Sequence, residues 1–293
     1  MKASYALVTA TWNEEKYIRH TIDAVLNQTI LPNAWVIVSD GSTDGTDEII
    51  KETATRSDFV VYIRKERTQE QKGFASKVYA IREGLKHLKN VSYSFIGHLD
   101  SDVSFAPNYY EQVLRKFDDE PRLGIAGGFI LEERAGRFKS RPSNTTRSVA
   151  GAIQLFRKEC YEAIGGFLPL PLGGEDWYAE IIARMRGWKV AAFPELKVLH
   201  HKPSVATRGI LRENSRQGLL DYSFGTHPLF EIVKCVRRMK EKPFVLGALV
   251  RMSRFLWAYC RLEKRPVSDE LVTYLRREQL GRLYAACFRH YDR

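Results

Sequence analysis

Cysteine is scarce in this sequence of 293 residues. The four cysteines lie far apart and form no CxxC pair. A disulfide framework typically shows denser, regularly spaced cysteines, so the pattern favours reduced thiols in a cytoplasmic protein. The four residues are Cys160, Cys235, Cys260 and Cys287.

Long apolar runs without charges are also lacking. The first residues, MKASYALVTATWNEE, offer too short an apolar stretch before Glu14 and Glu15 for a secretory signal. The best candidate for a transmembrane span, PFVLGALVRMSRFLWAYC, carries Arg251 and Arg254 near its middle. Each arginine costs about 2.5–3.5 kcal/mol at a bilayer centre. We therefore expect no transmembrane helix, and a cytoplasmic protein that is soluble or peripheral on the cytoplasmic face of the membrane.

Two common nucleotide-binding signatures are missing as well. The sequence contains neither GxGxxG nor GxxxxGK[ST], which argues against a dinucleotide-binding Rossmann site and a P-loop. There is no internal repeat and no low-complexity tract. With 44% hydrophobic and 28% charged residues, the chain is long enough for one large α/β domain with an appendage.

Positive charge is abundant and unevenly distributed. The net charge is +11, and residues 205–293 contain 18 Lys and Arg against 9 Asp and Glu. Such a bias suits nucleic acid, an acidic membrane surface or a phosphate-bearing substrate, and a solvated basic surface is the plain alternative. Nucleic acid is the least favoured partner because no aromatic stacking platform or reading module is recognisable.

Strand-like and helix-like segments alternate over the first two thirds of the chain. Apolar runs at 5–11, 34–40, 59–63 and 93–100 predict strands, and the segments between them, such as 74–89, predict helices. Strands that are apolar at every position predict a mostly parallel sheet with helices on both faces. In such Rossmann-like α/β folds, ligands gather at the carboxyl ends of the strands.

Two carboxylates follow the fourth of these strands, in FIGHLDSDVSF (95–105). In an extended chain, Asp100 and Asp102 would point the same way. Converging carboxylates suit Mg²⁺ or Mn²⁺, and Mg²⁺ is usually shared with substrate phosphates. An ordinary surface turn is the alternative for such a pair.

Two further segments carry candidate chemistry. VSDGSTDGT (38–46) places Asp40 at a strand end before a turn that could cap a helix. In LPLGGEDWYAE (170–180), a helix is expected to begin near Glu175. A carboxylate in the first helical turn stays ionised and suits a proton acceptor, although a helix acid without catalytic function would look the same.

Taken in order, TATWNEEKYI, VSDGSTDGT, LDSD and GGEDW resemble the family 2 glycosyltransferases of GT-A fold over about residues 4–203. The resemblance implies a metal-dependent inverting glycosyltransferase that uses Mn²⁺ or Mg²⁺ and a nucleotide-diphosphate sugar, with UDP as the expected nucleotide. The acceptor would be a hydroxyl of a glycan or a lipid-linked molecule, in polysaccharide or glycolipid biosynthesis. The QxxRW motif of processive synthases is absent, so transfer of a single sugar is expected.

The resemblance also implies roles for individual residues. The expected general base is Asp176, with Glu175 as the alternative. The expected metal ligands are Asp102, Asp100 and His200, with His201 as a rival. Lys72 or Lys77 would lie near the diphosphate. The expected nucleotide-binding residues are Thr9, Thr11, Asn13, Glu14, Asp40, Gly41, Ser42, Lys72, Gly73 and Asp100.

Two domains are expected. Residues 1–204 would form the catalytic domain, with the nucleotide-sugar half at about 1–103 and the acceptor half at about 104–204. Residues 205–293 would form a basic amphipathic helical extension. Its residues Arg251, Arg254 and Trp257 suggest contact with an anionic membrane surface. Packing on the catalytic domain and a homodimer are the alternatives.

Two other activities fit parts of the pattern. A nucleotidyltransferase acting on sugar phosphates would need a glycine-rich, basic loop after the first strand, and TATWNEE lacks one. A non-catalytic protein that binds nucleic acid or an anionic surface would account for the basic C-terminal third alone.

Overall fold

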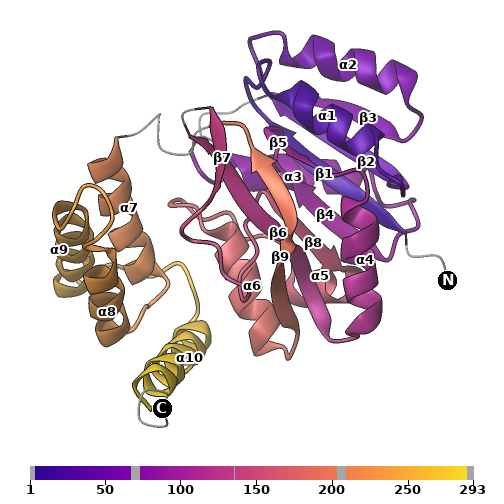
Figure 1. Ribbon diagram of the computed structural model, residues 1–293. Coiled ribbons are helices and arrows are strands. Elements are labelled where there is room, and N and C mark those ends of the chain that lie inside the picture. The colour runs from indigo at the N-terminus through magenta and orange to yellow at the C-terminus, as the bar shows by residue number, and fades with distance from the viewer. Residues whose placement is uncertain (1–3, 67–72, 135, 203–208, 289–293) are drawn as a thin grey trace. The chain divides into compact units, whose positions relative to one another are not determined.

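The computed structural model describes residues 4–66, 73–134, 136–202 and 209–288 (Figure 1). The chain divides into two compact units, Met1–Pro203 and Ser204–Arg293. The first unit contains a sheet with helices, and the second contains helices.

One mixed sheet organises the first unit. In the described residues its strand order is β3-β2-β1-β4-β8-β6-β9-β5, and β7 pairs with β6. The first four strands of this order are parallel, as are β6 and β9, whereas β8 runs antiparallel to both of its neighbours. The predicted mostly parallel α/β sheet is therefore confirmed. The strands are β1 (Tyr5–Thr11), β2 (Ala34–Asp40), β3 (Val60–Lys65), β4 (Phe95–Leu99), β5 (Val103–Phe105), β6 (Leu123–Arg134), β7 (Arg137–Ser140), β8 (Ile153–Arg157) and β9 (Lys189–His200).

Helices cover both faces of this sheet (Figure 1). Trp35 and Ile37 of β2 belong to the apolar core shared with α1, α2 and α4, whereas Val36 and Val38 belong to the core shared with α3, α5 and α6. A strand covered on both faces has no solvent side, which explains its uninterrupted apolar sequence. The helices are α1 (Ile18–Leu26), α2 (Thr46–Arg56), α3 (Ser76–Lys86), α4 (Tyr109–Asp119), α5 (Lys158–Ile164) and α6 (Glu175–Met185).

A glycine lets α3 lie close against the sheet. A Cβ at Gly84 would be 2.7 Å from Val8 Cγ1 and 3.1 Å from Val38 Cγ2, so a side chain there would push the helix away from β1 and β2. Gly84 therefore helps to set the distance between α3 and the strands. Lys77 lies in the first turn of this helix.

The parallel register gathers the strand ends at one edge of the sheet. Thr11 of β1 pairs with Ser39 of β2, and Val8 of β1 pairs with His98 of β4. The two carboxylates after β4 do not lie on an extended strand as the spacing argument assumed. Because β4 ends at Leu99 and β5 begins at Val103, Asp100 and Asp102 belong to the turn between them.

Helices make up the described part of the second unit, namely α7 (Ile210–Ser223), α8 (Pro228–Arg238), α9 (Leu246–Cys260) and α10 (Asp269–Phe288). Gly218 of α7 lies directly against the backbone of Arg251, which lets α7 and α9 pack closely. Tyr222, Phe255 and Ala258 form a small apolar cluster between these helices. Among the described residues, no helix has the length and apolarity needed to cross a membrane.

Buried charges connect three of these helices. Arg251 of α9 is only 3% exposed, which corrects its interpretation as a surface residue. Its guanidinium donates to Asp221 of α7 and to Glu231 of α8, the latter at 2.9 Å, and Lys234 reaches the same two carboxylates at 2.7 and 2.8 Å. Although burial alone would raise the pKa of Asp221, Lys234 and Arg251 bring that pKa below its ordinary value.

Replacing Arg251 tests how far the second unit depends on this cluster. We expect Arg251→Met to lower the free energy of unfolding by about 3–5 kcal/mol, because it leaves Asp221 and Glu231 buried with one cation fewer. Denaturant unfolding followed by circular dichroism measures the change. The variant Asp221→Leu/Glu231→Leu/Arg251→Met should recover much of the loss. A single substitution that costs less than about 1 kcal/mol would contradict the assignment.

Candidate active site

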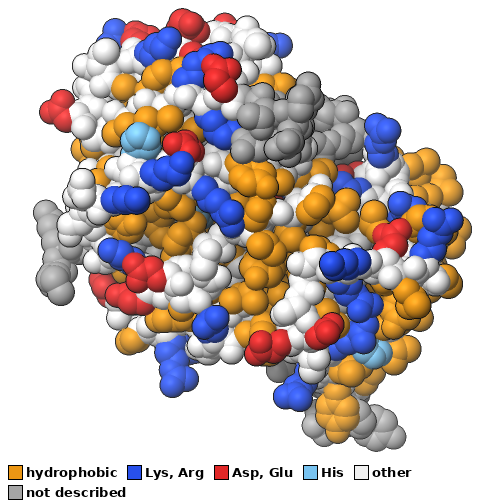
Figure 2. All heavy atoms as spheres, turned by 180° about the vertical axis from the view of Figure 1, so that it is seen from behind, with side chains coloured by type: hydrophobic (Ala, Val, Ile, Leu, Met, Phe, Trp, Pro, Cys, Tyr) orange, Lys and Arg blue, Asp and Glu red, His pale blue; other side chains and the backbone are white. Residues whose placement is uncertain are grey.

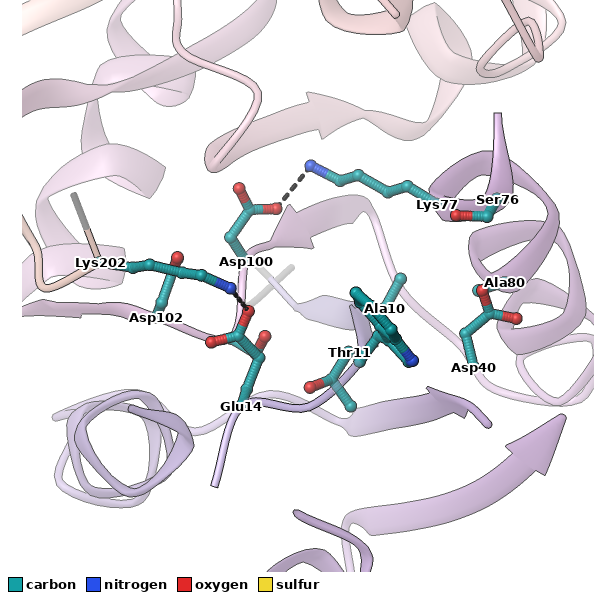
Figure 3. Close-up of a pocket in the computed structure, with 12 residues that line it drawn as sticks. Ala10, Thr11, Glu14, Asp40, Ser76, Lys77, Ala80, Asp100, Asp102 and Lys202 are labelled. Carbon is teal, nitrogen blue, oxygen red and sulfur yellow. Dashed lines mark hydrogen bonds and ion pairs between the residues drawn. The ribbon is translucent and has the colours of Figure 1, made fainter. Parts of the chain in front are cut away.

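An open pocket of about 220 Å³ lies where the strand ends meet (Figure 3). It combines the end of β1, the end of β2, the first turns of α3, the turn after β4 and the residue that follows His201 after β9. Carboxylates and lysines dominate its polar lining. The lining residues are Ala10, Thr11, Trp12, Glu14, Asp40, Ser76, Lys77, Ala80, Asp100, Ser101, Asp102 and Lys202.

Glu14 and Lys202 form an ion pair at one side of this pocket. Lys202 Nζ is 2.5 Å from Glu14 Oε1, and Figure 3 shows the pair beside Asp102. Burial raises the pKa of Glu14 to about 7; Lys202 lowers it, while Asp102 adds to the rise. Negative charge is therefore crowded here even with Lys202 present.

A second lysine pairs with the first residue of the acidic turn. Lys77 Nζ is 2.5 Å from Asp100 Oδ1 and 3.4 Å from the carbonyl oxygen of Gly151. Burial alone would lower the pKa of Lys77, but the surrounding carboxylates Asp100, Glu175 and Asp176 raise it above its ordinary value. The lysine thus stays charged and stands among the acids of both the turn and α6.

Asp102 is buried and incompletely paired. Its Oδ1 is 3.5 Å from His200 Nε2 and has no hydrogen-bond partner among the described residues. Burial raises the pKa of Asp102, and the neighbouring Asp100 raises it further. Burial also lowers the pKa of His200, which favours the neutral imidazole that metals bind.

These residues fit a divalent cation, because carboxylate oxygens and a neutral imidazole are suitable ligands and the bare Asp102 oxygen lacks a partner. The fit is incomplete in one respect. Within the described ranges, no three His, Cys, Asp or Glu side chains converge as they would around a metal ion. Asp100 instead turns to Lys77 (Figure 3), and the rival His201 contacts Ser104 Oγ at 2.8 Å.

The expected nucleotide-binding residues fall into several groups. Thr11, Glu14, Asp40 and Asp100 line the pocket. Asp40 accepts from Lys65 Nζ at 3.0 Å, and the buried Thr11 hydroxyl lacks a partner among the described residues.

Thr9 is the clear exception. Its side chain is fully buried, and its hydroxyl accepts a hydrogen bond from Trp35 Nε1 at 2.9 Å. The expectation that it binds nucleotide is corrected, because the hydroxyl is used inside the core.

Asn13, Gly41 and Ser42 shape the loops beside the pocket. Asn13 Oδ1 accepts from the Thr43 backbone N–H at 2.8 Å, and Ser42 Oγ accepts from the Asn13 backbone N–H at 3.1 Å. Gly41 has φ 72°, which suits a residue without a Cβ. These contacts join the loop after β1 to the loop after β2.

Gly73 begins the turn into α3. Its carbonyl oxygen accepts from the backbone N–H and the hydroxyl of Ser76, the latter at 2.9 Å. Gly73 is exposed and does not line the pocket. Lys72 lies outside the described residues.

The two expected catalytic acids begin α6, as predicted. Gly174, with φ 90°, precedes the helix, and Glu175 and Asp176 occupy its first turn. Asp176 is held at both oxygens, since Oδ2 accepts from the Gly151 N–H at 3.1 Å and Oδ1 accepts from the Trp177 N–H at 2.8 Å. Burial raises the pKa of Glu175, Lys77 opposes that rise and Asp176 adds to it.

Glu180, one turn further along α6, anchors the segment that contacts Asp176. Its Oε1 accepts from the Val149 N–H at 2.6 Å and from Ser148 Oγ at 3.2 Å. Burial raises the pKa of Glu180 to about 8, whereas Arg184 lowers it. The segment 148–151 is thus attached to α6 by two acidic side chains, those of Glu180 and Asp176.

The family model of glycosyl transferase family 2 matches residues 6–170. This chain belongs to glycosyl transferase family 2. The match includes the loops after β1 and β2 and the acidic turn, whereas α6 and Lys202 lie beyond it.

Curated relatives of this chain are named as glycosyltransferases. The putative glycosyltransferase EpsH of Bacillus subtilis (strain 168) is 34% identical over 156 residues, which are 53% of this chain and 41% of that protein. A dolichyl N-acetyl-alpha-D-glucosaminyl phosphate 3-beta-D-2,3-diacetamido-2,3-dideoxy-beta-D-glucuronosyltransferase of Methanococcus voltae is 31% identical over 131 residues, covering 43% of this chain and 38% of that protein. Each match spans less than half of the relative's length.

Solved structures share the GT-A fold. The mannosyltransferase PcManGT from Pyrobaculum calidifontis, in complex with GDP-Man and Mn²⁺, has a TM-score of 0.57 at 17% identity and covers 100% of this chain and 88% of its own. Residues 1–349 of TarS from S. aureus, in complex with UDP-GlcNAc, have a TM-score of 0.55 at 15% identity. The match covers 93% of this chain and 78% of the TarS chain. At such identities the likeness concerns the fold.

Sequence reasoning missed several pocket residues of this family 2 chain, among them Lys202 and Trp12. Lys202 directly follows the histidine pair that was singled out, but its partner Glu14 lies 188 positions earlier in the chain. Trp12 belongs to the motif TATWNEE and directly follows β1. It is 48% exposed and lines the pocket rather than the core. Lys77 was named only as an alternative to Lys72.

The raised pKa of Glu180 predicts a pH dependence of stability. An unfolded glutamate loses its proton near pH 4.3, whereas folded Glu180 keeps it up to about pH 8. The folded state therefore binds more protons in this window, and its stability falls as pH rises. We expect Glu180→Gln, which cannot ionise, to gain stability relative to the parent by about 3 kcal/mol between pH 5 and pH 8.

Urea unfolding of both proteins at pH 5, 6, 7 and 8 measures this gain. A stability difference that stays constant over the range would show that Glu180 ionises in the folded protein as it does in the unfolded chain.

Proposed function

We propose that this chain transfers a single sugar from a nucleotide-diphosphate sugar to a hydroxyl of a glycan or lipid-linked acceptor, with inversion at the anomeric carbon. The observation that carries the proposal is the pocket in which Asp102, buried and lacking a partner for one oxygen, lies beside Glu14, Asp100 and His200. Two lysines at the same pocket supply positive charge for a diphosphate. The relatives' names and the complexes with GDP-Man and UDP-GlcNAc support this choice of donor class.

Within residues 1–204 we assign the nucleotide-sugar half to about 1–103 and the acceptor half to about 104–204. Thr11, Asp40 and Glu14 would contact the nucleoside. Lys77 would neutralise the diphosphate, with Lys72 as the alternative. We retain UDP as the expected donor nucleotide because Asp40 at the end of β2 offers an acceptor to a base.

Asp102, with His200 and Asp100, would hold Mn²⁺ or Mg²⁺. A bound divalent cation supplies charge that stabilises the departing diphosphate. The complex of PcManGT with GDP-Man and Mn²⁺ supports this assignment. Asp100, which pairs with Lys77 in this structure, would hold the cation or the ribose, and Lys77 would neutralise charge on the phosphates.

Asp176 would act as the general base. It accepts the proton of the acceptor hydroxyl while that oxygen forms its bond to the anomeric carbon and the bond from this carbon to the phosphate oxygen breaks. The nucleoside diphosphate leaves with the electron pair. Two backbone N–H groups, of Gly151 and Trp177, fix the direction of its carboxylate. Glu175 remains the alternative base.

Two substitutions separate binding from chemistry. We expect Asp102→Ala and Asp176→Asn each to lower sugar transfer at least about 100-fold, because each removes a group required in the transition state. Only Asp102→Ala should weaken Mn²⁺-dependent nucleotide binding. Release of nucleoside diphosphate measures transfer, and thermal shift with UDP, GDP and dTDP in Mn²⁺ measures binding and identifies the base. Near-normal turnover by Asp176→Asn would overturn its role and direct attention to Glu175.

Gly151 offers a test that removes no charged group. A Cβ at this position would lie 2.7 Å from Asp176 Oδ2 and 2.9 Å from Asp176 Cβ, so Gly151→Ala forces the carboxylate to move. Because a displacement of about 1 Å costs up to 100-fold in rate, we expect turnover to fall roughly 10- to 100-fold. Nucleotide binding should be unchanged.

Gly281→Ala is the matched control, since a Cβ there meets no atom within 4 Å. It should leave transfer intact. Equal turnover by the two alanine variants would show that the position of Asp176 does not limit the reaction.

A further inference from the structure

Helix α8 buries a glutamate and exposes a row of aliphatic side chains, which is the reverse of the usual arrangement in a globular protein. Glu231 is fully buried against Arg251 and Lys234, whereas Leu229, Ile232, Val233 and Val236 are exposed, Leu229 at 56% and Val236 at 54%. These four residues have the spacing i, i+3, i+4, i+7 and share one face. We call them the α8 stripe.

Helix α9 carries a second exposed stripe. Its residues Leu246, Leu249, Leu256 and Trp257 recur at helical spacing, and Leu249 is 55% exposed. Phe244 and Val245, in the segment that joins α8 to α9, are exposed as well. The two helices contact each other, so one helical hairpin offers both stripes and an exposed apolar connection. Scattered exposed leucines are ordinary, but two stripes of this kind on adjoining helices mark an interaction surface.

Positive charge borders these stripes. Between positions 237 and 262 the only acidic residue is Glu241. The Trp257 ring lies under two guanidinium groups, with Arg254 at 4.1 Å and Arg261 at 4.5 Å from its centroid. Figure 2 shows how exposed hydrophobic side chains share the molecular surface with many Lys and Arg side chains. The other bordering cations are Arg237, Arg238, Lys240 and Lys242.

We propose that the α8–α9 hairpin binds an anionic phospholipid surface, with the stripes in the acyl boundary and the cations at the phosphate level. Aliphatic residues opposite Lys and Arg, with a tryptophan near the interface, are the composition of helices that lie in a membrane interface. The cores of protein–protein interfaces are instead poor in lysine. Arg251 has no part in this surface, because it is used in the buried cluster.

Vesicle co-sedimentation of the full chain tests the proposal without any donor or acceptor, so its result is independent of the proposed sugar transfer. We expect at least tenfold stronger binding to phosphatidylcholine vesicles with 30% phosphatidylglycerol than to phosphatidylcholine alone, and weaker binding as salt rises. Arg237→Gln/Lys240→Gln should weaken binding about 25-fold, roughly fivefold for each charge. Val236→Ser/Leu249→Ser should weaken it at least about tenfold.

The matched controls lie in the first unit, where Leu31 is 46% exposed and Lys89 is also exposed. Leu31→Ser and Lys89→Gln should bind vesicles as the parent does. Circular dichroism melting checks that each variant is folded.

Three outcomes would overturn the proposal. Negligible binding to both kinds of vesicle would do so, as would equal binding to neutral and anionic vesicles. The third outcome is that the parent does not bind vesicles and forms a dimer, as measured by light scattering, which Val236→Ser/Leu249→Ser dissociates. A second copy of the chain would then cover the stripes.

Discussion

Crowded carboxylates at one edge of the sheet are the constraint on which the first unit depends. Glu14, Asp100 and Asp102 come from segments that the parallel register brings together, and burial makes ionisation of Glu14 and Asp102 unfavourable. Lys202 and Lys77 offset part of this charge, yet one oxygen of Asp102 remains without a partner among the described residues. A fold selected for stability alone would not retain that arrangement, so it is explained best by a ligand that brings further positive charge and a substrate that shares it.

The same lysine connects the two ends of the proposed reaction. Lys77 contacts Asp100 on the donor side and the Gly151 carbonyl oxygen on the acceptor side, while the Gly151 N–H points to Asp176. Gly151 therefore lies between Asp100, which would face the diphosphate, and Asp176, which would take the proton. Glu180, mostly protonated at neutral pH, holds the adjacent backbone and so keeps this connection rigid without adding a further charge beside Asp176.

Local patterns were enough to predict the strands β1 to β4 and the helix that begins at Glu175, because each depends on neighbours in the chain. They failed where tertiary partners decide. Thr9 and Thr11 lie on the same face of β1 because they are two residues apart. The Thr9 hydroxyl accepts from the buried Trp35, whereas Thr11 lines the pocket, and spacing alone does not separate these two surroundings. Asp100 and Asp102 were found for a reason that was partly wrong, since a turn rather than a strand holds them. Lys202 gave no local signal of its distant partner.

Arg251 of the second unit shows the same limit of local sequence patterns. Its helix pattern gave no hint that two other helices would supply Asp221 and Glu231 as buried partners. A buried ion cluster adds little net stability, but it specifies one arrangement, because any rotation of α8 would leave a charge unpaired in the interior. With Glu231 fixed inward, the aliphatic face of α8 has to point outward. The cluster therefore determines which face of α8 is apolar and exposed, and the α8 stripe is a consequence of the buried charges rather than a defect in packing.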